Sequence, residues 1–169
     1  RMSEWQAAVL LAQLERLPEH TARRAANARY LTEALSAVAG VTPLPFDARI
    51  TGHAHHLFIM RYDETAFGGR SRAEFVRALV AEGIETASAG YTAPLNRNNA
   101  VRRAVANITR QGGRQRPTAA DGLPELESCP NAEWAAQHTI WLAQNTLLGD
   151  RADMDSIVAA ITKIQRAWG

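Results

Sequence analysis

The feature that most constrains the fold is a helical pattern that fills the first 39 residues. Ser3 and Gln6 have the spacing of a capping box at its start, and Gly40 follows its end. Pro18 interrupts the pattern by removing a backbone donor, although proline suits the first turn of a new helix. The sequence therefore predicts either two consecutive helices or one long bent helix over residues 1–39.

Beyond this segment the pattern changes to short runs that are typical of β-strands. Residues 56–62 predict a strand, and residues 84–86 predict a second one. Ser71 and Glu74 form another capping box, which begins a helix that should end at Gly83. Strands and helices therefore alternate in this part of the chain.

The second half of the chain mixes irregular segments with regular elements. Residues 90–97 are irregular and polar, a short helical stretch follows around residues 100–105, and residues 111–124 are typical of a mobile surface loop. Three elements are predicted to follow: a helix over 130–138, a buried strand over 139–142 and a closing helix over about 152–168. The succession predicts an α+β fold, in which a few-stranded sheet carries helices on one face.

Lys163 is the only lysine in the sequence, and arginine supplies every other basic side chain of the Lys/Arg class. A mechanism that needs a lysine nucleophile inside this chain must therefore use Lys163. This residue lies in the amphipathic closing segment, where a solvated position beside the apolar stripe is the simplest interpretation.

Charge and hydropathy exclude several classes of protein. The net charge of +2 comes from scattered arginines, which disfavours a nucleic-acid partner. No apolar run approaches the ~20 residues that span a bilayer. The start, Arg1-Met2-Ser3-Glu4, lacks the order of a signal peptide. We therefore expect a soluble cytoplasmic protein without a membrane partner.

Motifs for metal binding and nucleophilic catalysis are incomplete. His53, His55 and His56 cluster at a strand entry, but alternation sends the last two to opposite faces and no further ligand is suitably spaced. Cys129 precedes Pro130 without a nucleophile elbow, so we expect it to be a small buried hydrophobic residue. The sequence thus predicts no metal site and no catalytic residue in this chain.

Several segments together resemble one enzyme family, the DegT/StrS-type aminotransferases, which aminate keto-sugars and keto-cyclitols. The segments that carry the resemblance are Arg1 to Ala8, Gln13 to Leu17, His53 to Phe58, Gly68 to Phe75 and Ala81 to Ile84. His55 stands where the family usually has an aromatic residue. The resemblance covers nearly the whole chain.

The resemblance implies the small C-terminal domain of a fold-type I transferase that depends on pyridoxal phosphate. Residues 1–39 would link to a large domain outside this chain, and residues 40–169 would form the small domain. The large domain would carry the Schiff-base lysine and the acidic partner of the pyridine nitrogen. The complete protein is expected to be a homodimer, in which Arg1 approaches the partner's cofactor.

The resemblance also implies a substrate-side loop. Gly90-Tyr91 and Pro94-Leu95-Asn96 look like this loop, in which Pro-Leu is usually followed by histidine or tyrosine. Asn96 does not titrate near neutral pH, so it suits hydroxyl recognition better than proton transfer. Arg97 is a candidate for binding the donor carboxylate, with a solvated loop arginine as the alternative. Tyr91 either contacts a ligand or packs its ring under the loop.

Three further segments look like the aminocyclitol and aminobenzoate branch of this family: Cys129 to Asn131, Ile140 to Gln144 and Leu147 to Gly149. They favour a keto-cyclitol over a nucleotide-linked sugar as amino acceptor, and the family as a whole implies natural-product biosynthesis, such as that of antibiotics, or surface-sugar biosynthesis. Glutamine, glutamate and alanine are the expected amino donors. Two alternatives stay open, namely a non-enzymatic α+β binding or regulatory domain and an interaction module that uses the first helix.

Overall fold

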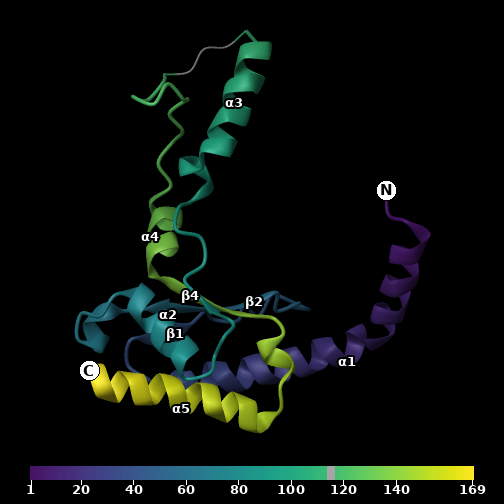
Figure 1. Cartoon of the computed structure of the whole chain (residues 1–169), viewed down its shortest axis with the longest axis vertical. Coiled ribbons are helices and arrows are strands. Elements are labelled where there is room, and N and C mark those ends of the chain that lie inside the picture. Colours follow the sequence, from purple (N-terminus) through teal and green to yellow (C-terminus); the bar gives the residue numbers. More distant parts are fainter. Residues whose placement is uncertain (114–116) are drawn as a thin grey trace. The chain divides into compact units, whose positions relative to one another are not determined.

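A computed structural model describes residues 1–113 and 117–169, and the chain divides into two compact units (Figure 1). Unit 1 comprises residues 1–89 and 140–169, and unit 2 comprises residues 90–139. The elements of unit 1 are α1 (Glu4–Leu35), β1 (Val41–Pro43), β2 (Leu57–Tyr62), η1 (Glu64–Phe67), α2 (Arg72–Ala81), β3 (Ala87–Ser88), β4 (Thr139–Ala143, whose first residue falls in unit 2), η3 (Thr146–Leu148) and α5 (Arg151–Trp168). Unit 2 contains η2 (Leu95–Arg97), α3 (Asn99–Gln111) and α4 (Pro130–His138).

Helix α1 is one continuous helix that contains Pro18, and it curves along its length in Figure 1. The predicted capping box is present, since Gln6 N donates to Ser3 Oγ at 3.3 Å and Ser3 N donates to Gln6 Oε1 at 2.9 Å. The helix ends at Leu35, and a turn continues to Gly40, which has a φ of 78°. A Cβ there would lie 2.8 Å from the Phe67 ring, so both backbone and packing require glycine.

The four strands form one sheet in the order β1-β2-β4-β3, with antiparallel pairs at both ends. Burial alternates along the two central strands. The buried side chains are Phe58, Met60 and Tyr62 on β2 and Ile140 and Leu142 on β4. Their neighbours along each strand are less buried, so one face of the sheet packs into the core as an α+β fold with helices on one face requires.

The prediction of a strand over residues 84–86 is wrong, because these residues complete the turn after α2. Gly83 has a φ of 92° at the helix end, and Ile84 N donates to Leu79 O at 2.9 Å. The strand begins only at Ala87, which pairs with Leu142.

The core of unit 1 lies between the sheet and helices α1, α2 and α5. An aromatic cluster joins Tyr62, Phe67 and Phe75, with the Tyr62 and Phe75 rings stacked 4.7 Å apart. The predicted apolar stripe of α5 faces this core through Met154, Ile157, Ile161 and Ile164, which are all buried. The closing helix is therefore amphipathic, as its periodicity predicts.

Unit 2 is more regular than its sequence suggests. Helix α3 extends to Gln111, well beyond the predicted stretch of 100–105. Within the predicted loop over 111–124, residues 114–116 lie outside the described residues. Residues 117–125 form a turn in which Ala119 N donates to Leu123 O and Glu125 N donates to Pro117 O, each at 2.9 Å. Helix α4 has the predicted bounds.

None of the helices described over residues 1–113 and 117–169 combines the length and the apolar character that a membrane span requires.

Candidate functional site

The predicted substrate loop lies in unit 2, where Asn96 and Arg97 follow each other in the short helix η2. Tyr91 precedes them and is 76% exposed. Arg1 lies exposed at the start of unit 1. The structure thus brings two of the four predicted residues into one local cluster.

Asn96 is held at both hydrogens of its amide. Its Nδ2 donates to the carbonyl oxygen of Glu127 at 3.0 Å and to Glu133 Oε1 at 3.3 Å. Because an ionised carboxylate only accepts, Glu133 fixes which way the amide points. Asn96 Oδ1 is buried and has no hydrogen-bond partner among the described residues. The amide therefore has an acceptor left and no donor.

Glu133 links the two predicted residues, and sequence reasoning missed it. Its Oε1 also accepts from Arg97 Nε at 3.3 Å and from Ser128 Oγ at 3.5 Å. The hydrogen bond from Asn96, followed by the charge of Arg97, lowers the pKa of the Glu133 carboxyl. A carboxylate in the first turn of a helix that begins with Pro130 is a recognisable signal, but it does not reveal a partner 36 residues away.

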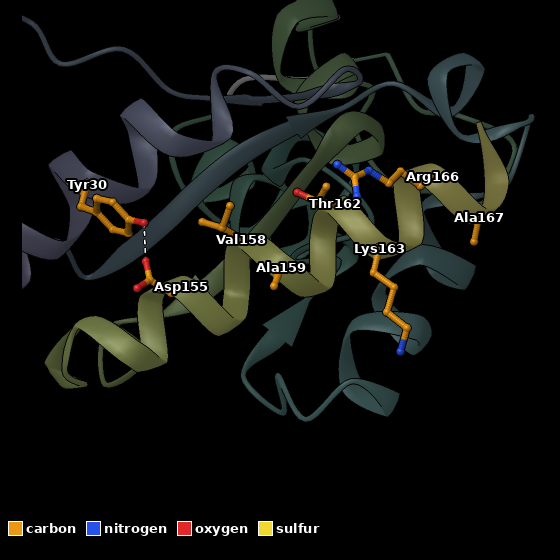
Figure 2. Close-up of a pocket in the computed structure, with 8 residues that line it drawn as sticks. All are labelled: Tyr30, Asp155, Val158, Ala159, Thr162, Lys163, Arg166 and Ala167. Atoms are coloured by element: carbon orange, nitrogen blue, oxygen red, sulfur yellow. Dashed lines mark hydrogen bonds between the residues drawn. The ribbon is translucent and has the colours of Figure 1, made fainter.

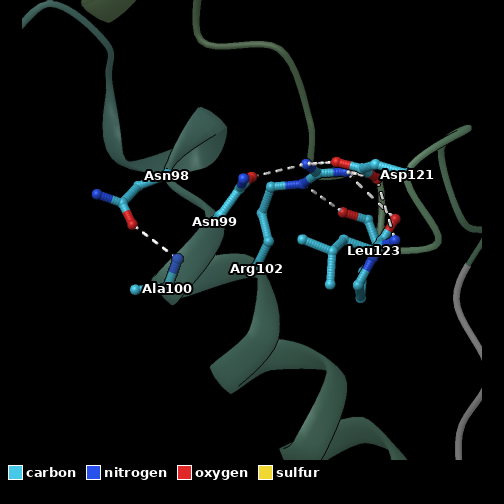
Figure 3. Close-up of polar contacts among 7 residues, drawn as sticks. Asn98, Asn99, Ala100, Arg102, Asp121 and Leu123 are labelled. Atoms are coloured by element: carbon cyan, nitrogen blue, oxygen red, sulfur yellow. Dashed lines mark hydrogen bonds and ion pairs between the residues drawn. The ribbon is translucent and has the colours of Figure 1, made fainter.

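A second arginine cluster fastens the turn of residues 117–125 to helix α3 (Figure 3). Arg102 Nε donates to Pro124 O at 3.1 Å, and its two terminal nitrogens donate to both carboxylate oxygens of Asp121. The remaining donors reach Asn99 Oδ1 and Leu123 O. All five guanidinium hydrogens are thereby used. The hydrogen bonds from Arg102 lower the pKa of Asp121.

These two clusters border a cavity of about 330 Å³ within unit 2. Its polar lining includes Asn96, Arg97, Arg102 and Asp121. The Arg102 side chain is 11% exposed and fully engaged, whereas the Arg97 side chain is 55% exposed. Arg97 is therefore the more accessible cation at this cavity.

In the histidine cluster of unit 1, His53 and His55 contact each other. His55 is buried with a φ of 48°, and its N donates to His53 Nδ1 at 2.9 Å. Burial, with a smaller contribution from His53, lowers the pKa of His55. His56 is exposed, as the predicted alternation requires. Among the residues described, no group of three or more His, Cys, Asp or Glu side chains is arranged to hold a metal ion.

The prediction that Cys129 is buried is wrong, because this residue precedes α4 in an irregular segment and is exposed. The prediction for Lys163 is confirmed. Its Nζ donates to both carboxylate oxygens of Glu82, at 2.8 and 2.9 Å, and its side chain is 69% exposed. Figure 2 shows Lys163 extending away from the hydrogen-bonded pair of Tyr30 and Asp155, on the surface of α5.

Comparison with known proteins gives a consistent result. Two proteins named L-glutamine:2-deoxy-scyllo-inosose aminotransferase, from Micromonospora echinospora and Streptoalloteichus tenebrarius, are each 33% identical to the chain. The matches cover 96% and 99% of this chain but only 37% and 38% of those proteins. The chain therefore spans about two fifths of the length of the curated relatives that it matches.

The fold has solved counterparts. The crystal structure of 3-amino-5-hydroxybenzoic acid synthase matches 97% of this chain with a TM-score of 0.72 and 26% identity, over 39% of its own length. A structure of DesV from S. venezuelae in complex with a ketimine intermediate matches 98% of the chain with a TM-score of 0.67 and 25% identity, over 37% of its own length. The family model for the DegT/DnrJ/EryC1/StrS aminotransferases matches residues 1–162. The chain therefore belongs to the DegT/DnrJ/EryC1/StrS aminotransferase family.

Proposed function

We propose that this chain is the C-terminal part of an aminotransferase that depends on pyridoxal phosphate and transfers the amino group of L-glutamine to a keto-cyclitol. The observation that carries the proposal is the family match over residues 1–162. The names of the relatives support the substrates, because they pair L-glutamine with a scyllo-inosose. The name of the structural counterpart, an aminohydroxybenzoic acid synthase, also favours a ring compound over a nucleotide-linked sugar.

The cofactor requires a lysine that this chain does not offer in a suitable place. Pyridoxal phosphate supplies the electron sink of transamination and is bound through a lysine Schiff base. Lys163 is the only lysine, and its Nζ is bound to both oxygens of Glu82 at an exposed position on α5. The residues of this chain thus do not fit the covalent site, and no catalytic step is assigned to them. In our proposal a large domain supplies the lysine.

Helix α1 fits the role of a link to such a domain. Its second half is buried in unit 1 through Ala28, Leu31 and Leu35. Its first half exposes large apolar side chains, namely Trp5, Val9, Leu10, Leu11, Leu14 and Leu17. Exposed apolar patches of this kind mark surfaces that other parts of a protein cover. We therefore assign residues 1–39 to the link and residues 40–169 to the small domain.

The proposed contributions of this chain to the site are recognition contacts. The exposed Tyr91 ring and the polar side chains of Asn96 and Arg97 are assigned to substrate binding. A guanidinium suits the carboxylate of the amino donor. Asn96 Oδ1, which has no partner among the described residues, is the acceptor that the proposal assigns to a cyclitol hydroxyl. Arg1 is assigned to the partner's cofactor in a cytoplasmic homodimer. Neither nucleic acid nor membrane is a partner in this proposal.

The test uses the complete protein supplied with pyridoxal phosphate. We expect amination of 2-deoxy-scyllo-inosose from L-glutamine and the visible absorption of a cofactor–lysine Schiff base. Lys163→Ala should retain both, whereas residues 1–169 alone should show neither. A Schiff-base absorption from residues 1–169 that disappears in Lys163→Ala would refute the proposed division of labour.

Two other outcomes support the alternatives. A complete protein that stays colourless with the cofactor would favour a non-enzymatic binding or regulatory domain. A stable partner complex that dissociates when Trp5 or Leu14 is made polar, in a protein without transaminase activity, would favour an interaction module.

A further inference from the structure

We propose that Glu133 is an exchangeable counter-ion of Arg97, which neutralises the guanidinium when the neutral ketone is bound and yields it to the carboxylate of the amino donor. The inference rests on the proposed function, because it applies to a site that receives two different substrates in turn. No covalent step is involved. Glu133 acts as a positioning residue, and its partner exchange sets the preference between the two substrates.

The two substrates make opposite electrostatic demands on one site. L-Glutamine carries a carboxylate, whereas 2-deoxy-scyllo-inosose, the ketone in the names of two relatives, is neutral. A guanidinium that is always unpaired would be costly while the neutral ketone excludes water from it. A guanidinium that is always paired would be unable to bind the donor. An arginine that serves both substrates therefore needs a counter-ion that it can exchange.

The geometry of the Arg97–Glu133 pair fits this exchange. Arg97 Nε donates to Glu133 Oε1 at 3.3 Å, and one terminal nitrogen of Arg97 lies 3.3 Å from the same oxygen. This is longer than the ~2.7–2.9 Å of strong charge-assisted hydrogen bonds, and it lacks the parallel two-oxygen arrangement. The side chains are 55% and 30% exposed. Pairs of this kind are weak, so an incoming carboxylate can displace Glu133 at small cost.

The second arginine of unit 2 shows what a permanent pair looks like. Arg102 binds both oxygens of Asp121, and its other donors reach three further acceptors. No donor is left for a ligand, and the side chain is 11% exposed. Both arginines line the same cavity, yet only Arg97 is held loosely enough to change partners.

Glu133 keeps partners after Arg97 leaves. Asn96 Nδ2 donates to it at 3.3 Å, and Ser128 Oγ donates to it at 3.5 Å. A carboxylate that retains hydrogen bonds avoids most of the cost of an unpaired charge. Asn96 therefore anchors Glu133 in both states, and the exchange needs only a movement of the Arg97 side chain.

The experiment compares the complete wild-type enzyme with Glu133→Gln, which removes the competing charge. We expect kcat/KM for L-glutamine to rise about two- to fivefold, the range set by the loss of an exposed ion pair. We expect kcat/KM for 2-deoxy-scyllo-inosose to stay equal or fall, because Arg97 is then unpaired beside the ketone. The inhibition constant of glutarate, a dicarboxylate probe without an amino group, should also fall.

Two control variants isolate the pair. Glu127→Gln makes the same change of charge in a nearby exposed side chain and keeps the backbone carbonyl to which Asn96 donates. It should therefore leave kcat/KM unchanged for both L-glutamine and 2-deoxy-scyllo-inosose. In an Arg97→Ala background, which itself should weaken glutamine binding, Glu133→Gln should have no effect on the donor. A role of Glu133 in folding alone would lower activity with both substrates equally.

The inference is overturned if Glu133→Gln melts like Glu127→Gln and leaves kcat/KM for glutamine unchanged or lower. If Glu133→Gln does not fold, Glu133→Asp replaces it, since the carboxylate is then one methylene shorter and should also release Arg97. An inactive wild-type enzyme would refute the proposed function instead. In that case calorimetric titration with glutarate decides the inference, which fails if wild type and Glu133→Gln bind it equally.

Discussion

Unit 1 and unit 2 are each stabilised internally by a different kind of interaction. Among the residues described, every side chain of the buried hydrophobic core belongs to unit 1. Unit 2 instead relies on the Arg102–Asp121 cluster, on Glu133 and on backbone hydrogen bonds of its turn. Apolar burial is insensitive to added salt, whereas salt screens ion pairs. The polar residues assigned to substrate recognition lie in the unit that is easier to perturb.

The largest expected effect separates the units by an identical substitution. Ile161→Ala removes a fully buried side chain from unit 1 and should lower the free energy of unfolding by about 2–5 kcal/mol. Ile108→Ala in unit 2 shortens a side chain that is 68% exposed and should change the free energy of unfolding by less than about 0.5 kcal/mol. Denaturant unfolding of the chain measures both. Equal losses would show that unit 2 has an apolar core of its own.

The next effect is local and concerns the Arg102 cluster. Arg102→Lys keeps the charge but cannot replace five directed donors, so the amides of residues 99–102 and 118–125 should exchange their hydrogens much faster. The amides of α5 should keep their protection. Arg103→Lys, at an exposed neighbouring position, is the matched control. Unchanged exchange in Arg102→Lys would mean that the turn is held by its backbone alone.

Acid should act on unit 1 before it acts on unit 2. Burial lowers the pKa of His55 from its usual 6.5, with further lowering from His53 and from the positive charges of Arg24 and Arg29. The unfolded chain therefore takes up this proton first, and unit 1 loses stability as the pH falls below about 6.5.

In unit 2 the lowered carboxyl pKa values of Asp121 and Glu133 stabilise the fold above about 4, and that contribution is lost as the pH falls through them. An acid titration followed by NMR, with amide signals from both units, measures the order in which the units lose stability. His55→Asn, which tolerates the same backbone conformation, should abolish the first phase only. A first phase that persists in His55→Asn would assign it to another group.

The smallest expected effect is that of salt. Raising sodium chloride from about 0.05 to about 0.5 M should speed hydrogen exchange in the turn of residues 117–125, because part of its stability comes from the ion pair between Arg102 and Asp121, whose carboxylate side chain is 46% exposed. The buried stripe of α5 should not respond. If α5 responds equally, the contrast between the units does not rest on electrostatics.

The same contrast explains what could be predicted from the sequence. Unit 1 follows local patterns: the boxes at Ser3 and Ser71 cap helices, and the periodicity of α5 places its buried stripe. The prediction of a strand over residues 84–86 was wrong because a turn and a short strand have similar composition. Such patterns report which side chains are buried, and burial is what organises this unit.

Unit 2 was predicted less completely because its organising contacts join distant positions. Asn96 and Arg97 were identified through a family resemblance, but Glu133 lies 36 residues beyond Arg97. Asp121 lies 19 residues beyond Arg102. Charges scattered at such separations leave no periodic trace, so their pairing becomes visible only in three dimensions. Cys129 was misjudged for a related reason, since the described residues of unit 2 contribute no side chain to the buried hydrophobic core.

Because α1 continues without a break through Pro18, the angle about the helix axis between side chains of its two halves is fixed. Because each residue of a helix turns its successor by about 100°, the direction in which Trp5 points is set by the packing of Leu31 in the core of unit 1. One residue inserted near Pro18 would rotate the exposed apolar half by that angle, and a fourth inserted residue would nearly restore it. Whatever covers this half is therefore registered against the core in angle as well as in distance.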